Sequence, residues 1–597
     1  MGRIRLATTA SLFLLLAACD DDSSTTKFPP APDLAVAQDM AATVPEMAVP
    51  PPDLALPLPD MPKVPVNLQL LDISDWHGQL DPLTVGGQDI GGAGVLCGYF
   101  RQDRVTNPNT LTFTAGDSFG ASPPLSNFFD DVPAVKALNI MGIDADTFGN
   151  HDFDRGIAKL QALIDMAQYK YVSANLDKLA DNLGKVDSPF HMFNVAGVNV
   201  AVIGITNPDA PTLTAMGSLG TLTVTDPVAA ATSAAAKARM AGAHVVVVLV
   251  HMGALAKDMN GNYSGPLIDF AKAAQGIDVI FGDHTNLAVN TTLNGALVVE
   301  NLSFGQSYAR VSLTVDPNGA GKITQSKVEI IKPYRCQQVP MDGGVPDGGF
   351  QCMPAVTACP EAEMMLAPYR TQLTAIFDTK IGTAADVFNR GNNVERLGEV
   401  PIGDLVADAV RLRYMTKIAI VSSGGLRAPL PSSYKPADMT LRRTTMGYAM
   451  GPPYDLVVGD AFAVLPFGNL VVTRNVTGQQ LWKILERSVG QLPLPFGGFL
   501  QISGFKITAN ITKAAGMRVQ SVMLDDGTMI PNDPNFMISV ATSDFTNNGG
   551  DGYVELGGDP QGTTREKMFD VLLGYIKQLG AIDPKMYPLD RIKLVVM

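Results

Sequence analysis

The feature that most constrains this chain is a series of short apolar segments that alternate with helix-like stretches. The segment 245–250 contains only Val and Leu, and 277–281 is rich in residues of the same kind. Runs of this length favour strands that are buried on both faces, whereas 156–168 and 226–240 have the character of helices. The alternation predicts a layered α/β protein.

Polar residues that can bind metal ions follow five of these apolar segments directly. The segments are 66–73, 110–115, 140–148, 245–250 and 277–281. The residues that follow them include Asp75, His77, Asp117, Asn150, His151, His251 and His284. Such residues meet at one edge of an open α/β sheet, where these sheets bind ligands. Asp75 and His77 are two residues apart, so in an extended chain their side chains would point the same way.

This set of side chains predicts a metal site with two ions. Four of the six histidines of the chain lie at strand ends, beside Asp, Asn or Gly. A mixed set of nitrogen and oxygen ligands suits a borderline divalent ion such as Zn²⁺ or Mn²⁺. Six or seven ligands are too many for one tetrahedral ion. The other two histidines, His191 and His244, lack such a setting and are interpreted as structural.

The overall charge excludes one class of partner. The formal net charge is −14 and the pI is about 4.9. A protein that coats nucleic acid through its charge needs a surplus of Lys and Arg, so no nucleic-acid polymer is expected. A small phosphorylated substrate stays compatible, because a metal ion supplies positive charge locally. Beyond the N-terminus, no apolar run approaches the ~18 residues of a membrane-spanning helix.

The first 65 residues are predicted to contain a targeting signal and a tether. Residues 1–18 combine two arginines with a short apolar core, as in a signal peptide. The residues before Cys19 resemble a bacterial lipoprotein signal, which implies lipidation of Cys19; an ordinary signal peptide with a chance cysteine is the alternative. Residues 19–65 contain 11 prolines and eight acidic residues, which predicts a disordered tether. We therefore expect an exported protein, lipid-anchored to a bacterial membrane and facing the periplasm or the cell surface.

Two ordered sets of motifs resemble a known enzyme family. The first set is similar to the calcineurin-like metallophosphoesterases: Asp75-x-His77, Gly116-Asp117, Gly149-Asn150-His151-Asp152, His251 and Gly282-x-His284. The second set is similar to the C-terminal substrate domain of the 5′-nucleotidases: Arg396-x-x-Glu399, Gly424-Gly425-Leu426-Arg427, Leu465-Pro466-Phe467-Gly468-Asn469, Gln501-Ile502-Ser503-Gly504 and Phe545-x-x-Asn548-Gly549-Gly550-Asp551-Gly552. This branch includes UDP-sugar hydrolases and 2′,3′-cyclic-nucleotide phosphodiesterases.

The resemblance covers residues 66–597 and implies a fold class and a domain order. It implies an α/β protein in which residues 66–333 form a four-layer α/β/β/α metallophosphoesterase sandwich. Residues 334–360 would be a linker that contains cysteines. Residues 361–597 would form a C-terminal α/β substrate-binding domain.

The cysteines after Cys19 are expected to form disulfides, because export makes such bonds possible. Three of them, Cys336, Cys352 and Cys359, lie close together, and one bond among these three is expected. Cys97 would then be either a buried thiol or the partner of a distant cysteine.

The resemblance also implies a role for each site residue. Asp75 and His77 would bind the first metal ion, Asp117 would bridge both ions, and Asn150, His251 and His284 would bind the second. Asn286 could bind the first ion through its amide oxygen, more weakly than an imidazole. His151, oriented by Asp154, would form the catalytic dyad. The implied substrate-binding residues are Arg396, Arg427, Phe467, Phe545, Asn548 and Asp551.

Some positions depart from the family pattern. Asp283 replaces a usual glycine and could either help to hold the metals or support their ligands. Ser422 and Asp404 each replace an asparagine near the implied substrate pocket, which leaves the preference for base and sugar open.

The implied function is that of a metal-dependent phosphohydrolase that uses two divalent ions (Zn²⁺, Mn²⁺ or Co²⁺) to release phosphate from extracytoplasmic nucleotides. Two ions can stabilise in-line attack at phosphorus, and Arg side chains match the geometry of phosphate. Two aromatic rings can stack a flat base. The alternatives are activity on 2′,3′-cyclic nucleotides, UDP-sugars or a sulfur-linked group, and a surface binding lipoprotein with a weakened metal site. No protein partner is predicted.

Overall fold

The computed structural model describes residues 63–596, with gaps at 87, 215–216, 320, 341–349, 391–392 and 558–561. The predicted signal peptide, Cys19 and all but the last three residues of the predicted tether lie outside the described residues. The chain from residue 62 onward forms one compact unit. In the described ranges, no helix combines the length and the apolar character needed to cross a membrane.

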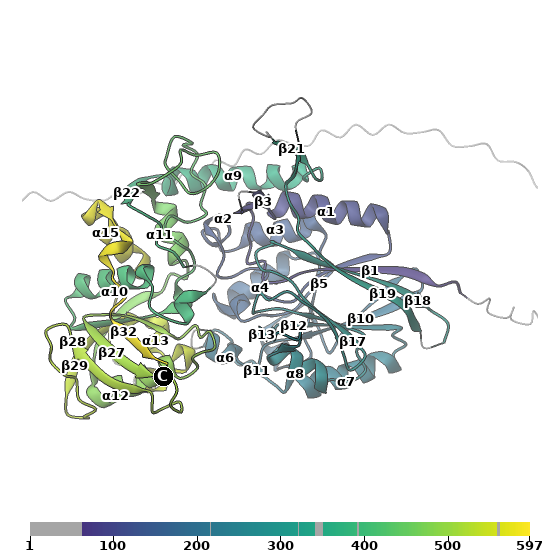
Figure 1. Ribbon diagram of the computed structural model, residues 1–597. Coiled ribbons are helices and arrows are strands. Elements are labelled where there is room, and N and C mark those ends of the chain that lie inside the picture. Colours follow the sequence, from purple (N-terminus) through teal and green to yellow (C-terminus); the bar gives the residue numbers. More distant parts are fainter. Residues whose placement is uncertain are drawn as a thin grey trace, which may run out of the picture. The chain divides into compact units, whose positions relative to one another are not determined.

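Two sheets form the centre of the N-terminal region (Figure 1). In spatial order, the first contains β19 (Lys322–Ile331), β18 (Tyr308–Asp316), β1 (Val66–Ile73), β4 (Thr110–Thr114), β5 (Ala145–Asp146), β6 (Lys170–Val172) and β8 (Val186–Asp187). The second contains β16 (Val289–Leu293), β17 (Ala296–Glu300), β15 (Val279–Gly282), β12 (Val245–Val250), β10 (Val198–Ile205) and β9 (His191–Val195). The strands β1, β4, β5 and β6 run parallel, as do β10, β12, β15 and β17.

Helices cover the outer faces of these two sheets. The helices α1 (Ala93–Thr106), α3 (Val132–Met141) and α4 (Ile157–Met166) pack on the first sheet, and α7 (Pro227–Met240) and α8 (Pro266–Ala273) pack on the second. Helix α7 begins where sequence reasoning expects, because the Asp226 side chain accepts a 2.7 Å hydrogen bond from the N–H of Ala229.

The strand β12 shows why a wholly apolar segment belongs in this fold. Val245, Val247 and Leu249 point into the core between the two sheets, whereas Val246, Val248 and Val250 point into the core under α7 and α8. Successive side chains of a strand point to opposite faces, so both faces of β12 are buried. The predicted four-layer α/β/β/α arrangement is confirmed.

The C-terminal region is also α/β. After helix α9 (Pro360–Phe377), a five-stranded sheet has the order β26 (Leu500–Ser503), β23 (Ile418–Ser422), β29 (Met537–Ser543), β25 (Leu470–Thr477) and β30 (Thr563–Lys567). Two three-stranded sheets use strands that alternate with these along the chain. The first contains β24 (Tyr454–Val457), β22 (Lys380–Ala384) and β31 (Ala581–Ile582), and the second contains β28 (Val519–Leu524), β27 (Phe505–Asn510) and β32 (Ile592–Val595). The main helices are α10 (Pro401–Tyr414), α11 (Val458–Val464), α12 (Gly478–Val489) and α15 (Met568–Leu579).

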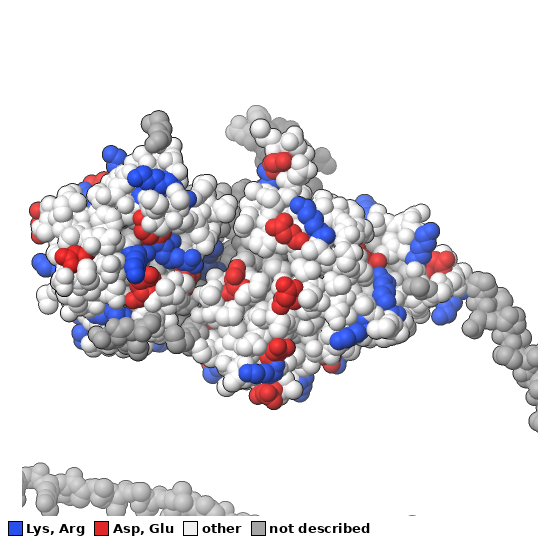
Figure 2. Space-filling model, turned by 90° about the horizontal axis from the view of Figure 1, so that it is seen from below, with Lys and Arg blue, Asp and Glu red and all other residues white. Residues whose placement is uncertain are grey.

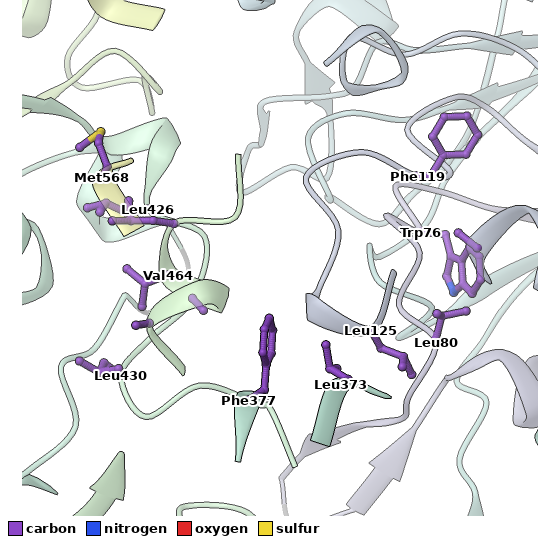
Figure 3. Close-up of a cluster of buried hydrophobic side chains, with 14 of the residues drawn as sticks. Trp76, Leu80, Phe119, Leu125, Leu373, Phe377, Leu426, Leu430, Val464 and Met568 are labelled. Carbon is purple, nitrogen blue, oxygen red and sulfur yellow. The ribbon is translucent and has the colours of Figure 1, made fainter. Parts of the chain in front are cut away.

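Buried side chains of helix α9 belong to one hydrophobic core that extends through both regions. Figure 3 shows the cluster, which runs from Trp76 and Leu125 through Leu373 and Phe377 to Leu430. The ring of Phe377 is the central contact, because it packs against N-terminal and C-terminal side chains and is 2 % exposed. Helix α9 is therefore packed into the core that joins the two regions.

The prediction of a strand over 140–148 is wrong for most of that segment. Residues 140 and 141 end helix α3, which closes at Gly142 in the left-handed conformation with φ 70°. Only Ala145–Asp146 pair as a strand. A run of apolar residues does not distinguish the buried end of a helix from a short strand.

A disulfide joins Cys97 on α1 to Cys359 at the start of α9. Cys97 is thus the partner of a distant cysteine, which was one of the two alternatives. Cys336 is also disulfide-bonded.

The surface carries few charges. On the face shown in Figure 2, basic and acidic side chains are interspersed among uncharged ones, in line with a charged fraction of 17%.

Candidate active site

The predicted metal ligands occupy tight turns at the ends of the strands. Six predicted site residues have positive φ angles: Asp75, His77, Asp117, His284, Asn286 and Asp551. Such angles are uncommon outside glycine, and they concentrate at functional sites. The expected extended conformation of Asp75 and His77 is wrong, since their φ angles are 41° and 50°. The turn nevertheless brings them together, with His77 Nε2 3.8 Å from Asp75 Oδ1.

Two groups of ligand atoms share Asp117. The first group is Asp75, His77 and Asp117, and the second is Asp117, His251 and His284; within each, the ligand atoms lie within 4.8 Å of one another. In the second group, His251 Nε2 lies 3.1 Å from Asp117 Oδ2 and 3.2 Å from His284 Nδ1. Asp117 therefore lies where a carboxylate could bridge two ions.

Unpaired buried oxygens support the interpretation as a metal site. Asp75 Oδ1, Asn150 Oδ1 and Asn286 Oδ1 are buried and have no hydrogen-bond partner. A buried polar atom without a partner costs about 1–3 kcal/mol, and more if it is charged. Burial also raises the pKa of Asp75 to about 6. Bound cations would satisfy these oxygens, so the residues fit the divalent ions that the motifs predict.

Two histidines of the ligand groups, His77 and His284, are kept neutral by burial. Burial lowers the pKa of both His77 and His284 to about 3, which keeps these imidazoles in the neutral form that binds metals. The Nδ1 of His77 lies 2.8 Å from the carbonyl oxygen of Gly120, and the Nδ1 of His251 lies 3.1 Å from that of Ala115. These carbonyls orient the rings and leave each Nε2 facing the other ligands.

The predicted dyad is formed. His151 Nδ1 lies 2.9 Å from Asp154 Oδ2, and the backbone N–H of His151 donates a 2.7 Å hydrogen bond to Asp117 Oδ1. Burial opposes protonation of His151, but the nearby carboxylates of Asp154 and Asp117 outweigh it and raise its pKa. His151 thus sits beside the centre of the metal groups with a carboxylate behind its ring.

Sequence reasoning gave no role to Asp152, although it belongs to the same motif. Asp152 is 3 % exposed, and its Oδ2 accepts hydrogen bonds from the N–H groups of Asp117, at 3.1 Å, and Gly149, at 2.7 Å. A Cβ on Gly149 would lie 2.1 Å from Asp117 Oδ1, so this position needs glycine. Asp152 and Gly149 together fix the turn that carries Asp117. The signal in the sequence that could have identified Asp152 was its place in the motif that also contains Asn150 and His151.

Part of the predicted substrate set reaches the dyad. The ring of Phe467 stacks on the imidazole of His151, with centroids 5.6 Å apart and an interplanar angle of 13°, and the Arg427 guanidinium lies 5.6 Å from the Phe467 centroid. Burial, together with the neighbouring cations Arg390 and Arg396, lowers the pKa of Arg427 to about 9. Arg390 is a third cation here that sequence reasoning missed.

The rest of the predicted substrate set gathers around the helix α13 (Asp544–Asn547). Phe545 lies in this helix, and Asn548 ends it. Asp551 follows, and its Oδ2 accepts a 2.6 Å hydrogen bond from Ser422 Oγ. Among the aromatic contacts of the described residues, none joins Phe545 to Phe467.

Comparisons with known proteins agree with this architecture. Residues 380–557 match the family described as 5'-nucleotidase, C-terminal domain. The chain is 28% identical over 502 residues to Endonuclease YhcR of Bacillus subtilis (strain 168), covering 80% of this chain but only 37% of that longer protein. It is 25% identical over 565 residues to the snake venom 5'-nucleotidase of Naja atra, covering 87% of this chain and 97% of that protein. A crystal structure of a 5'-nucleotidase precursor from Thermus thermophilus superposes with a TM-score of 0.71 at 24% identity, covering 89% of this chain and 99% of that chain.

The four-layer fold, with buried His/Asp groups at its strand ends, is that of a metallophosphoesterase. Residues 380–557 match the 5'-nucleotidase C-terminal domain, and the chain is similar to 5'-nucleotidases over most of its length.

Proposed function

We propose that this protein is a metal-dependent phosphohydrolase that releases phosphate from extracytoplasmic nucleotides. The observation that carries the proposal is the pair of ligand groups that share Asp117, with His151 hydrogen-bonded to the same carboxylate. A phosphate ester needs a cationic centre and a proton donor on the same side, and this arrangement supplies both.

The two ions would be held by the residues that meet at the strand ends. Asp75, His77, Asp117 and Asn286 would hold the first ion. Asp117, Asn150, His251 and His284 would hold the second. When bound, the two ions supply Lewis-acid stabilisation of the charge that develops on the phosphoryl oxygens.

The remaining site residues bind the substrate and move protons. His151 Nε2 is the free ring nitrogen, because Nδ1 faces Asp154, and it would protonate the departing oxygen of the ester. Arg427, with Arg396, would bind the anionic part of the substrate. Phe467 and Phe545 would contact the base, with Asn548 and Asp551 on the nucleoside side.

Export is part of the proposal. The Cys97–Cys359 disulfide supports an oxidising compartment. A relative that is 25% identical over 546 residues carries the name Cell wall protein Lmo0130 of Listeria monocytogenes. Lipidation at Cys19 and anchoring to the membrane rest on the signal-like N-terminus alone.

The test is phosphate release from AMP by the metal-stripped protein before and after addition of Mn²⁺, Zn²⁺ or Co²⁺. We expect release only with metal, and we expect His151→Ala to lower kcat at least ~100-fold while bound metal persists. His191→Ala is the matched control, because His191, at the start of β9, pairs with Asp187 and its replacement should leave kcat within about twofold. Metal-independent release, or unchanged turnover in His151→Ala, would refute the mechanism. UDP-glucose and 2′,3′-cyclic AMP as substrates decide between the related activities.

A further inference from the structure

Asp283 is a buried carboxylate beside the proposed metal centre that the proposed reaction leaves without a role. It follows directly after β15 and is 0 % exposed. Its Oδ1 accepts a 2.9 Å hydrogen bond from the N–H of His284. Its Oδ2 is buried and has no hydrogen-bond partner.

Asp283 lies on the opposite side of the His251 imidazole from the side chains of two proposed metal ligands, Asp117 and His284. The Nε2 of His251 faces Asp117 and His284, which is the side of the metal groups. The Nδ1 of His251 faces the other way, with Ala115 O at 3.1 Å and Asp283 Oδ2 at 3.6 Å. Asp283 therefore lies behind the imidazole, as an outer carboxylate does in a carboxylate–histidine–metal arrangement.

Asp283 also reaches the other metal group. Ligand atoms of Asp75, His251 and Asp283 lie within 4.8 Å of one another. One side chain thus lies within 4.8 Å of a proposed ligand of the first ion and of a proposed ligand of the second, and it also accepts the hydrogen bond from the backbone of His284.

We propose that Asp283 is a positioning residue that holds His251 and His284 in place and adds negative charge behind both ions. This inference rests on the proposed metal centre. With ions bound, the same charge strengthens the attraction between the site and the cations. Residues that support metal ligands in this way typically change metal affinity 10–100-fold when they are replaced.

The test compares Asp283→Asn and Asp283→Ala with the wild type in the full chain. Calorimetric titration of the metal-stripped proteins with Mn²⁺ gives the affinity, and thermal melting without metal gives the intrinsic stability. We expect both variants to bind Mn²⁺ about 10–100-fold more weakly. We expect the metal-free melting temperature of Asp283→Asn to stay close to that of the wild type, because the side chain keeps its volume and its amide oxygen still accepts from the N–H of His284.

Asp72→Asn is the matched control. Asp72 is equally buried, but its Oδ2 accepts from Ser74 and Asn301, and it belongs to none of the ligand groups. Its replacement should leave Mn²⁺ affinity unchanged. Equal Mn²⁺ affinity of the wild type and Asp283→Asn would overturn the proposed role of Asp283. Weaker Mn²⁺ binding in Asp283→Ala alone would overturn it as well, because the cause would then be the lost side-chain volume and not the lost carboxylate.

Phosphate release by the wild type is measured on the same samples. A wild type that binds Mn²⁺ and releases no phosphate would contradict the proposed function while the affinity comparison still decides the role of Asp283. A wild type that binds no Mn²⁺ would overturn the metal centre and, with it, this inference.

Discussion

Replacement of Asp404 by Asn is expected to remove a large pH dependence from the stability of the C-terminal region. Asp404 lies in the first turn of α10 and is 0 % exposed. Neither carboxyl oxygen has a hydrogen-bond partner, and the nearest cation is Arg591, whose Nε lies 3.7 Å away. Burial, aided by Glu399 and Asp408 and opposed by Arg591, raises the pKa of Asp404 from 3.8 to about 9.

The magnitude follows from the difference in bound protons. Between about pH 5 and pH 8, Asp404 is protonated in the folded protein and ionised in the unfolded chain, so folding takes up one proton. The free energy of unfolding therefore falls by about 1.4 kcal/mol per pH unit as the pH rises. Between pH 6 and pH 8 this amounts to about 2.7 kcal/mol, and Asp404→Asn, which does not titrate, escapes the loss.

Urea unfolding at pH 6, 7 and 8 measures this effect. The chain has two tryptophans, so in a Trp76→Phe background the fluorescence of Trp482 reports on the C-terminal region alone. The control is Asp408→Asn, because Asp408 accepts 2.8 Å and 2.9 Å hydrogen bonds from Arg591, and its loss should destabilise at every pH. A constant difference between Asp404→Asn and the parent across the three pH values would refute the reasoning.

Three further predictions concern the metals, the joint between the regions and the substrate. Removal of metal by a chelator should lower the melting temperature, since ions present at 100 times their Kd stabilise by about 2.7 kcal/mol; identical melting with and without Mn²⁺ would contradict the site. Phe377→Ala should destabilise by about 3–5 kcal/mol in urea unfolding, and Phe128→Ala, at a ring that is 41% exposed, by much less; equal losses would contradict the packing of α9. Phe545→Ala should raise KM for AMP more than KM for p-nitrophenyl phosphate, and equal changes would exclude a contact with the base.

Much of the site could be predicted because most of the ligands follow a strand that local composition reveals. The predicted bounds of β1 match the structure, and the seven proposed metal ligands include all members of two of the three ligand groups. The roles of these residues in binding and catalysis stay predictions. Asp152 and Arg390 were not assigned and the role of Asp283 was left open, because Asp152 also binds the N–H of Asp117, Asp283 lies beside His251, and Arg390 lies near Arg427, and only folding brings these pairs together.

The sequence by itself determined which segments are strands buried on both faces and which polar side chains leave them, because side-chain burial imposes a local pattern on composition. Only the tertiary structure decided that Cys97 pairs with Cys359 across 262 residues, that residues 140 and 141 end a helix, and that Asp75 and His77 meet through left-handed turns. Contacts between distant residues leave no local pattern, because they depend on how sheets and helices pack after the strands have formed.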